Sequence, residues 1–350
     1  MKSRIPAGAA AGLAVALSLA ACSSTDTGPS TATNAASGAA GGKVGIDHPR
    51  ADTDFWNSYI KYVPEMAQQL GVDLLPATNS QNDVQKLVSN TNALVGQGAK
   101  AIVMAPQDTG AIASTLEQLA GKKIPVVSVD TRPDKGPVYM VVRADNRAYG
   151  QKACEFLGDK LAGKGEVVQL MGSLSSVNGR DRAEAFRECM KSKFSGITVY
   201  EAPTEWDGGK AASMLQTLLQ QHPGIKGIYM HAGGAHLAPT LQVLKSKNLI
   251  VPPTDPKHIF VVSNDGIPQE LAAIRAGEID ATVSQPADAY AKYALFYAKA
   301  ALEGKTFKPG PTDHDSTIIQ LPNGLEDQLP APLVTKENVD DKALWGNQIK

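Results

Sequence analysis

Short apolar runs rich in β-branched residues alternate with longer amphipathic segments from Lys43 onward. In the first half, strands are predicted over 43–47, 72–76, 101–105 and 126–129, and helices over 54–70, 82–97 and 109–120. Tyr59, Val63 and Met66 follow one another at intervals of four and three residues, which is typical of one buried helix face. Repeated β-α-β units require parallel strands with right-handed crossovers. The first half is therefore predicted to be a doubly wound α/β domain.

The same alternation begins again after Asp145-Asn146. Here strands are predicted over 166–171, 197–200, 227–231, 259–263 and 280–284, and helices over 147–161, 181–193, 208–221, 235–247, 268–276 and 287–302. The fold class is thus α/β, with two doubly wound, Rossmann-like parallel-sheet domains joined by hinge crossovers. We assign 43–144 with 286–312 to an N-terminal lobe and 145–285 with 313–350 to a C-terminal lobe. Hinges are expected near Ala144-Asp145, Ser284-Gln285 and Pro311–Ser316.

The first 42 residues have a different pattern. Lys2 and Arg4 precede an apolar run of small residues that ends at Leu19-Ala20-Ala21-Cys22, a sequence that resembles the bacterial lipobox. This run is too short and too interrupted for a membrane-spanning helix, which needs about 20 apolar residues. Residues 1–21 are predicted to be a lipoprotein signal peptide, with an ordinary cleaved signal peptide as the alternative. Cys22 would carry the lipid, and 22–42, poor in charge and aromatics, would be a flexible tether.

Composition narrows the function further. The 350 residues include 34 Lys and Arg against 35 Asp and Glu, so the net charge is -1 and no basic excess is present to neutralise nucleic acid. No Gly-x-Gly-x-x-Gly motif follows the first predicted strand, which argues against a dinucleotide cofactor. The closest histidines, His231 and His236, are five residues apart, a spacing that does not place both on one helix face for a metal. We expect no cofactor and no metal.

Two cysteines lie in the predicted second domain. Cys154 and Cys189 fall on the two helices that flank strand 166–171. A disulfide between them is expected if the chain works outside the cytoplasm, and two separately buried thiols are the alternative.

Polar and aromatic residues gather just after the predicted strands, where open parallel sheets bind ligands. The runs that carry this pattern are Asp54-Phe55-Trp56, Gln81-Asn82-Asp83, Ala105-Pro106-Gln107-Asp108, Ile124 to Asp130, Ala144-Asp145-Asn146, Arg180 to Phe186, Val262 to Gly266 and Thr282 to Pro286. Together, and in this order, they resemble the periplasmic sugar-binding proteins of the ribose-binding type, the substrate receptors of ABC importers. The resemblance covers about 43–302 and implies the type I periplasmic-binding-protein fold. Lactose-type repressors share the domain pair but carry an N-terminal helix-turn-helix, whereas a lipobox stands here.

The resemblance implies a sugar site between the lobes. Asp130 of the first lobe would accept hydroxyl protons, Arg180 and Asp265 of the second would hold the ligand, and Gln285 would both donate and accept. The chain departs from the family at Ala105, at Thr131 and at Ala232-Gly233. Arg132, His231 and Asn264 are candidate substitutes, and Thr131 itself is also a candidate ligand-binding residue.

Aromatic residues at strand ends point to the same ligand independently of the family. Sugars present apolar C–H faces as well as hydroxyls, and Trp56 and Trp206, with Phe55, stand at strand ends of the two domains. The competing interpretation for these three residues is that they are core or surface aromatics. For Asp130 and Asp265 it is a helix N-cap, and for Arg180 a surface ion pair at the start of the helix.

The predicted function is an extracytoplasmic, lipid-anchored receptor, expected to be a monomer. It would bind a small neutral sugar or sugar alcohol, close around it and deliver it to the membrane subunits of an ABC permease. It would not be an enzyme. Two alternatives stay open: a lipoprotein that serves a sensor or chemotaxis receptor, and a glycosidase that uses Asp130 and Asp265 as a carboxylate pair.

Overall fold

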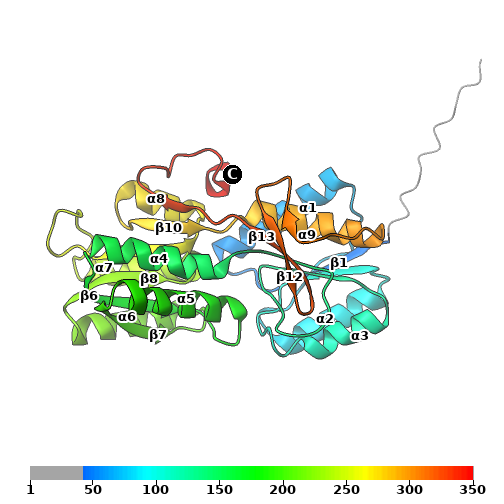
Figure 1. Ribbon diagram of the computed structural model, residues 1–350, viewed down its shortest axis with the longest axis horizontal. Helices are drawn as coiled ribbons and strands as arrows, with labels where there is room; N and C mark the ends of the chain where they lie inside the picture. Colours follow the sequence, from blue (N-terminus) through cyan, green and yellow to red (C-terminus); the bar gives the residue numbers. More distant parts are fainter. Residues whose placement is uncertain (1–41, 350) are drawn as a thin grey trace, which may run out of the picture. The chain divides into compact units, whose positions relative to one another are not determined.

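Two α/β lobes make up the part of the chain that the structure describes, residues 42–349 of a computed structural model (Figure 1). The predicted signal peptide, Cys22 and nearly all of the predicted tether lie outside the described residues. None of the helices within 42–349 combines the length and apolar character required to cross a membrane.

The first lobe is built on an eight-stranded sheet in the order β11-β12-β13-β5-β4-β3-β1-β2. Its strands are β1 (Val44–His48), β2 (Thr78–Asn79), β3 (Ala101–Met104), β4 (Val126–Val129), β5 (Met140–Ala144), β11 (Gly310–Pro311), β12 (Thr317–Leu321) and β13 (Gly324–Leu329). Strands β1 to β5 and β13 pair in parallel, whereas β12 is antiparallel to both of its neighbours. The central strands are buried from end to end, which explains their continuous apolar sequence.

Helices cover both faces of this sheet. One face is covered by α1 (Asp54–Leu70) and α9 (Ala287–Leu302), the other by α2 (Val84–Gly96) and α3 (Ala113–Gly121) (Figure 1). Helix α1 begins where the Thr53 side chain accepts from the Trp56 N–H and ends at Gly71, which has a left-handed φ of 63°. Buried alanines along α9 allow it to pack closely on α1 and on the strands. This packing fixes the position of α1 on the sheet.

The second lobe has a six-stranded sheet in the order β14-β10-β9-β8-β6-β7. Its strands are β6 (Lys164–Met171), β7 (Gly196–Pro203), β8 (Ile225–Met230), β9 (Phe260–Asp265), β10 (Ala281–Ser284) and the antiparallel β14 (Leu333–Thr335). Its helices are α4 (Asn146–Lys160), α5 (Val177–Lys193), α6 (Gly208–Gln221), α7 (Gly233–Ser246) and α8 (Pro268–Ala276), followed by the short α10 (Trp345–Gln348). Helices α4 and α5 pack on one face and α6, α7 and α8 on the other.

The third crossing between the lobes lies later in the chain than the sequence predicted. We assigned 313–350 to the second lobe, but β12 and β13 form a hairpin whose second strand pairs with β5 of the first sheet. The chain crosses only after Leu329 and then adds β14 to the second sheet (Figure 1). The hairpin turns at Pro322-Asn323. The Asn323-Gly324 pair is a sequence typical of hairpins, but the sequence analysis treated this segment as a Pro-rich tail without strands.

Smaller differences concern individual strands. The segment 72–76 makes only an isolated bridge, Leu74 to Val44, and the second strand is the two-residue β2 instead. Strand β5 was missed by the sequence analysis. Cys154 and Cys189 form a disulfide that joins α4 to α5, with their Cα atoms 6.2 Å apart.

Candidate ligand-binding site

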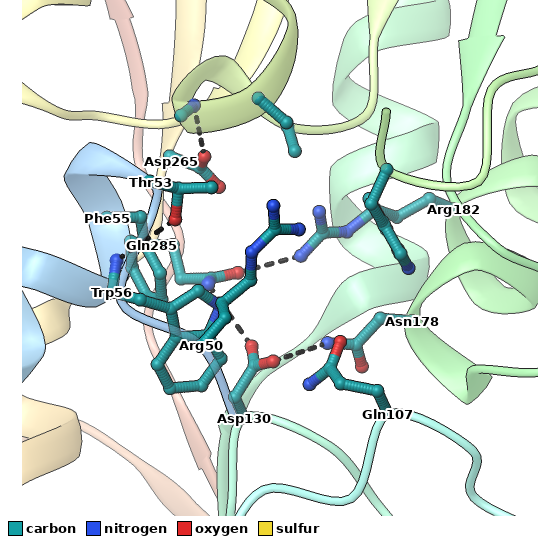
Figure 2. A pocket seen from close by; sticks show the side chains of 14 residues that line it. Arg50, Thr53, Phe55, Trp56, Gln107, Asp130, Asn178, Arg182, Asp265 and Gln285 are labelled. Carbon is teal, nitrogen blue, oxygen red and sulfur yellow. Dashed lines mark hydrogen bonds between the residues drawn. The ribbon is translucent and has the colours of Figure 1, made fainter. Parts of the chain in front are cut away.

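A cavity of about 50 Å³ lies between the two lobes, beyond the carboxyl ends of their parallel strands (Figure 2). The first lobe lines it with Arg50, Thr53, Phe55, Trp56, Gln107 and Asp130, and the second with Asn178, Arg182, Trp206, Ala232, Gly234, Ala235, Asp265 and Gln285. The wall therefore combines three large aromatic side chains with two carboxylates, two guanidinium groups and three side-chain amides.

Asp130 follows β4 and has a left-handed φ of 65°. Its two carboxylate oxygens accept one amide N–H each, from Asn178 Nδ2 at 3.0 Å and from Gln285 Nε2 at 3.1 Å. Burial raises the pKa of Asp130 to about 6, against the lowering effect of the Arg182 and Arg143 charges. Because Asn178 belongs to the second lobe, the Asp130 carboxylate connects the lobes directly.

Asp265 ends β9 and faces the same cavity (Figure 2). Its Oδ2 accepts the Gly234 N–H at 2.8 Å, and burial raises its pKa to about 7 while Arg182 acts in the opposite direction. A side chain at 234 would fit tightly, since an added Cβ would stand 3.3 Å from both Asp265 Oδ2 and the Phe55 nitrogen. Below it, Glu270 accepts the N–H groups of Gly266 and Ile267, and burial raises its pKa to about 8.

The Arg182 guanidinium is buried, and its three hydrogen-bond acceptors are neutral: Asn146 Oδ1 at 2.6 Å, Gln285 Oε1 at 2.7 Å and the His231 carbonyl. It also lies over the ring of Trp206, 5.7 Å from its centre. Gln285 accepts from Arg182 and donates to Asp130, so these three side chains form one chain of hydrogen bonds (Figure 2). Such a chain offers hydroxyl groups both donors and acceptors in fixed directions.

Three aromatic side chains provide the apolar part of the wall. Phe55 and Trp56 meet edge to face at the N-terminus of α1, with ring centres 5.3 Å apart. Trp206 lies in the opposite lobe, and its buried Nε1 has no hydrogen-bond partner among the described residues. Its ring occupies the space of an absent side chain, because a Cβ at Gly172 would stand only 2.0–2.2 Å from ring atoms of Trp206. Apolar faces with one free donor suit a polyhydroxy ligand.

Residues 44–306 match the protein-family model of the periplasmic binding protein domain. The chain belongs to this family. The family predicted from strand-end motifs is thus confirmed.

Among curated members, the ribose import binding protein RbsB of Bacillus subtilis (strain 168) is 28% identical over 262 residues, covering 75% of this chain and 82% of the relative. The xylitol-binding protein of Mycolicibacterium smegmatis is 25% identical over 264 residues, covering 75% and 68%. Solved structures share the fold. They include an arabinose ABC transporter component from Shewanella sp. ANA-3, with a TM-score of 0.74, 21% identity and 87% and 96% coverage.

Six of the predicted ligand-binding residues of this periplasmic binding protein line the cavity: Phe55, Trp56, Asp130, Trp206, Asp265 and Gln285. Arg180 does not. Along α5, Asn178 and Arg182 are four residues apart and share the face toward the cavity, whereas position 180 is turned about 200° from 182. Arg182 therefore stands where Arg180 was expected.

The other four predicted residues lie outside the cavity lining. Arg132 reaches Glu326 at 3.4 Å and Asp181 at 3.5 Å instead. Thr131 is buried, and its carbonyl accepts from the Ser128 hydroxyl at 2.6 Å. His231 and Asn264 are fully buried and do not line the cavity. The His231 Nδ1 accepts the Gly172 N–H, and Asn264 donates to the Tyr229 hydroxyl and the His231 carbonyl. They support the site without facing it.

Sequence reasoning missed Arg50, Thr53, Gln107, Asn178 and Arg182. Two of these, Gln107 and Arg182, lie inside motifs that the sequence analysis noted. It chose Arg180 from the second of these motifs and no ligand-binding residue from the first. Arg50 follows β1 in a loop without a recognised motif, and its side chain points into the cavity while pairing with Asp52 (Figure 2). Within residues 42–349, no cluster of His, Cys, Asp and Glu is suited to hold a metal ion.

Proposed function

We propose that this protein is an extracytoplasmic receptor that binds a small neutral sugar or sugar alcohol between its lobes and delivers it to an ABC permease. The observation that best supports this proposal is a cavity with one wall from each lobe. In it, Arg182, Gln285 and Asp130 form a chain of hydrogen-bond donors and acceptors, beside the rings of Trp56 and Trp206. A ligand that contacts both walls stabilises the closed arrangement, and a permease can then recognise that arrangement.

The names of the relatives support this ligand class. Curated relatives include binding proteins for ribose, D-allose and xylitol, which cover an aldopentose, an aldohexose and a pentitol. One structural neighbour, from Mycobacterium smegmatis, contains glycerol (TM-score 0.73, 24% identity). A cyclic sugar and an acyclic polyol are both consistent with the cavity wall, because its polar side chains can form hydrogen bonds with the hydroxyl groups of either.

We infer that the site binds and does not catalyse. Both oxygens of Asp130 accept amide hydrogens, and Asp265 accepts a backbone N–H, so the two carboxylates are oriented as hydrogen-bond acceptors. Turnover of a bound glycoside by the purified protein would restore the glycosidase alternative.

We further propose that Cys22 carries a lipid anchor outside the cytoplasm and that the receptor is a monomer. The support is the lipobox-like sequence before Cys22, together with the membership of a periplasmic family. A Cys22→Ala variant should move from the membrane fraction to the soluble fraction. Retention of this variant in the membrane fraction would contradict lipid anchoring.

A thermal-shift panel of pentoses, hexoses, tetritols, pentitols and hexitols tests the function, followed by calorimetry on each hit. A ligand at 100 times its dissociation constant should stabilise the protein by roughly 2.7 kcal/mol. Arg182→Gln should abolish the shift, because it removes the guanidinium that donates to Asn146, His231 and Gln285. Arg187→Gln on the exposed side of the same helix should keep it. No shift with any sugar or polyol would overturn the proposal.

A further inference from the structure

The start of α5 also contacts the first lobe outside the cavity. Arg180 Nη2 lies 2.5 Å from Asp134 Oδ1, and the same nitrogen donates to the Thr109 hydroxyl at 3.3 Å. Beside them, the Thr109 N–H donates to the Ser175 carbonyl at 3.2 Å. Arg180 and Ser175 belong to the second lobe, and Thr109 and Asp134 to the first. These contacts therefore cross between the lobes.

Each side of this contact is held within its own lobe. In the second lobe, Arg180 Nη1 donates to the carbonyls of Leu174 and Ser175, at 3.0 and 3.2 Å. In the first, the Asp134 N–H donates to the Thr109 carbonyl at 2.9 Å, and the Thr109 hydroxyl donates to Asp134 Oδ1 at 3.2 Å. Both side chains thus have contacts within their own lobes that favour the paired orientation, which lowers the side-chain entropy lost on pairing.

Neither Arg180 nor Asp134 lines the cavity. The helical spacing explains why Arg180 lies outside the cavity lining, because Asn178 and Arg182 occupy the face of α5 toward the cavity and Arg180 lies on another face. The pair can therefore change the balance between open and closed lobes without contacting the ligand.

We propose that Arg180 and Asp134 are positioning residues that form a latch, which stabilises the closed lobes and slows ligand release. The expected effect on ligand release rests on the proposed receptor function. The expected effect on lobe closure does not depend on it. The side chains are about one-third exposed, 32% for Arg180 and 36% for Asp134, so the effect is modest and sensitive to salt. Loss of the pair should speed dissociation about two- to fivefold.

The test compares Arg180→Gln, Asp134→Asn and the double variant in the full chain. Dissociation of a sugar identified by the thermal-shift panel is followed by stopped-flow tryptophan fluorescence at 0.05 and 1 M NaCl. Each single variant should release every bound sugar about two- to fivefold faster at low salt, and the double variant should be no faster than the singles. High salt should speed release from the wild type but not from the variants.

The matched control is Arg187→Gln. Arg187 lies on the same helix and pairs with Glu201 of the same lobe at 2.7 Å, so its loss should leave release unchanged. Wild-type release rates in both single variants would overturn the latch. A changed ranking among sugars would also overturn it, because that result would place Arg180 in contact with ligand.

Small-angle scattering of ligand-free protein separates the latch from the receptor proposal. Arg180→Gln and Asp134→Asn should have a larger radius of gyration than the wild type and Arg187→Gln. If the wild type binds no sugar, the receptor proposal fails while this comparison still decides the latch. Equal radii for all four proteins would then reject the latch.

Discussion

Three residues of the cavity wall have backbone conformations that L-amino acids rarely adopt. Asp130 and Trp206 have φ values of 65° and 60°, and Asp265 has a φ of 125°. Such conformations cost of the order of 1–3 kcal/mol each and persist only where the surrounding structure imposes them. Asp130 follows β4, Asp265 ends β9 and Trp206 lies three residues after β7, and all three line the cavity between the lobes. Local strain thus accompanies the shape of the cavity wall.

Replacement of Asp265 should show how burial of its carboxyl affects stability. Because its pKa is about 7 when folded and 3.8 ordinarily, the unfolded chain loses this proton at lower pH than the folded chain. Asp265 therefore lowers stability progressively as pH rises from about 4 to about 7, and the full cost remains above that range. Asp265→Asn should raise the free energy of unfolding of ligand-free protein by up to about 4 kcal/mol at pH 8, with little change near pH 4.

Urea unfolding at pH 4.5 and pH 8 measures this difference, with the exposed Asp159→Asn as control. The same variant should bind sugar at least about tenfold more weakly at pH 8, because an ionised acceptor is lost. Parallel pH profiles for Asp265→Asn and the wild type would show that this carboxyl is not the source of the dependence.

At the scale of elements, α5 has several structural roles along its length. Asn178 and Arg182 face the cavity, Arg180 forms the proposed latch, and Asp181 accepts from Arg143 of the first lobe at 3.1 Å. Cys189 in its last turns is bonded to α4. The orientation of this one helix therefore determines the cavity wall and the contact between the lobes together.

Removal of the disulfide should lower the free energy of unfolding without abolishing sugar binding. The bond closes a loop of 35 residues, and the chain-entropy model assigns such a loop about 3–4 kcal/mol of stability. The Cys154→Ser, Cys189→Ser double variant should lose about 2–4 kcal/mol in denaturant unfolding. Its sugar affinity should stay near the wild-type value because α4 and α5 still pack through Leu157 and Phe186.

Reduced wild-type protein provides the control, since it should match the double variant. If the oxidised wild type and the double variant unfold at the same denaturant concentration, the disulfide does not contribute to stability in solution.

At the scale of the whole molecule, the C-terminal segment ties the lobes together. After β14, Trp345 of α10 donates from Nε1 to the Asp265 carbonyl of the second lobe at 3.3 Å. Its ring also meets Phe55 of the first lobe edge to face, with centres 6.1 Å apart. This third tryptophan lies behind the site, where it supports one residue from each wall.

Trp345→Ala should therefore act on both lobes. The loss of a buried aromatic ring should lower the free energy of unfolding by about 3–5 kcal/mol. Sugar affinity should fall as well, although Trp345 is not part of the cavity lining. Calorimetry and urea unfolding measure the two effects.

The comparison variant is Trp345→Phe, which keeps the ring contact but loses the hydrogen bond and should cost only about 1 kcal/mol beyond the volume change. Unchanged affinity in Trp345→Ala would mean that this residue supports the fold alone.

The sequence by itself determined the repeated α/β architecture and part of the site. Periodic spacing and the alternation of elements predicted helices 54–70, 208–221, 268–276 and 287–302, whose observed bounds agree with the predicted ones. Strand-end motifs identified Asp130, Asp265 and Gln285. These succeed because burial within one lobe leaves a periodic trace along the chain, and because parallel strands bring their carboxyl ends to one edge.

Only the tertiary structure decided which residues meet across the lobes. It placed Arg182 at the cavity and Arg180 against Asp134, added the β12–β13 hairpin to the first sheet, and brought Trp345 behind Phe55. Two arginines separated by one residue have the same chemistry, and the helix register against the opposite lobe is what distinguishes them. Contacts between segments distant in sequence depend on how packed lobes are positioned, and no local pattern records that.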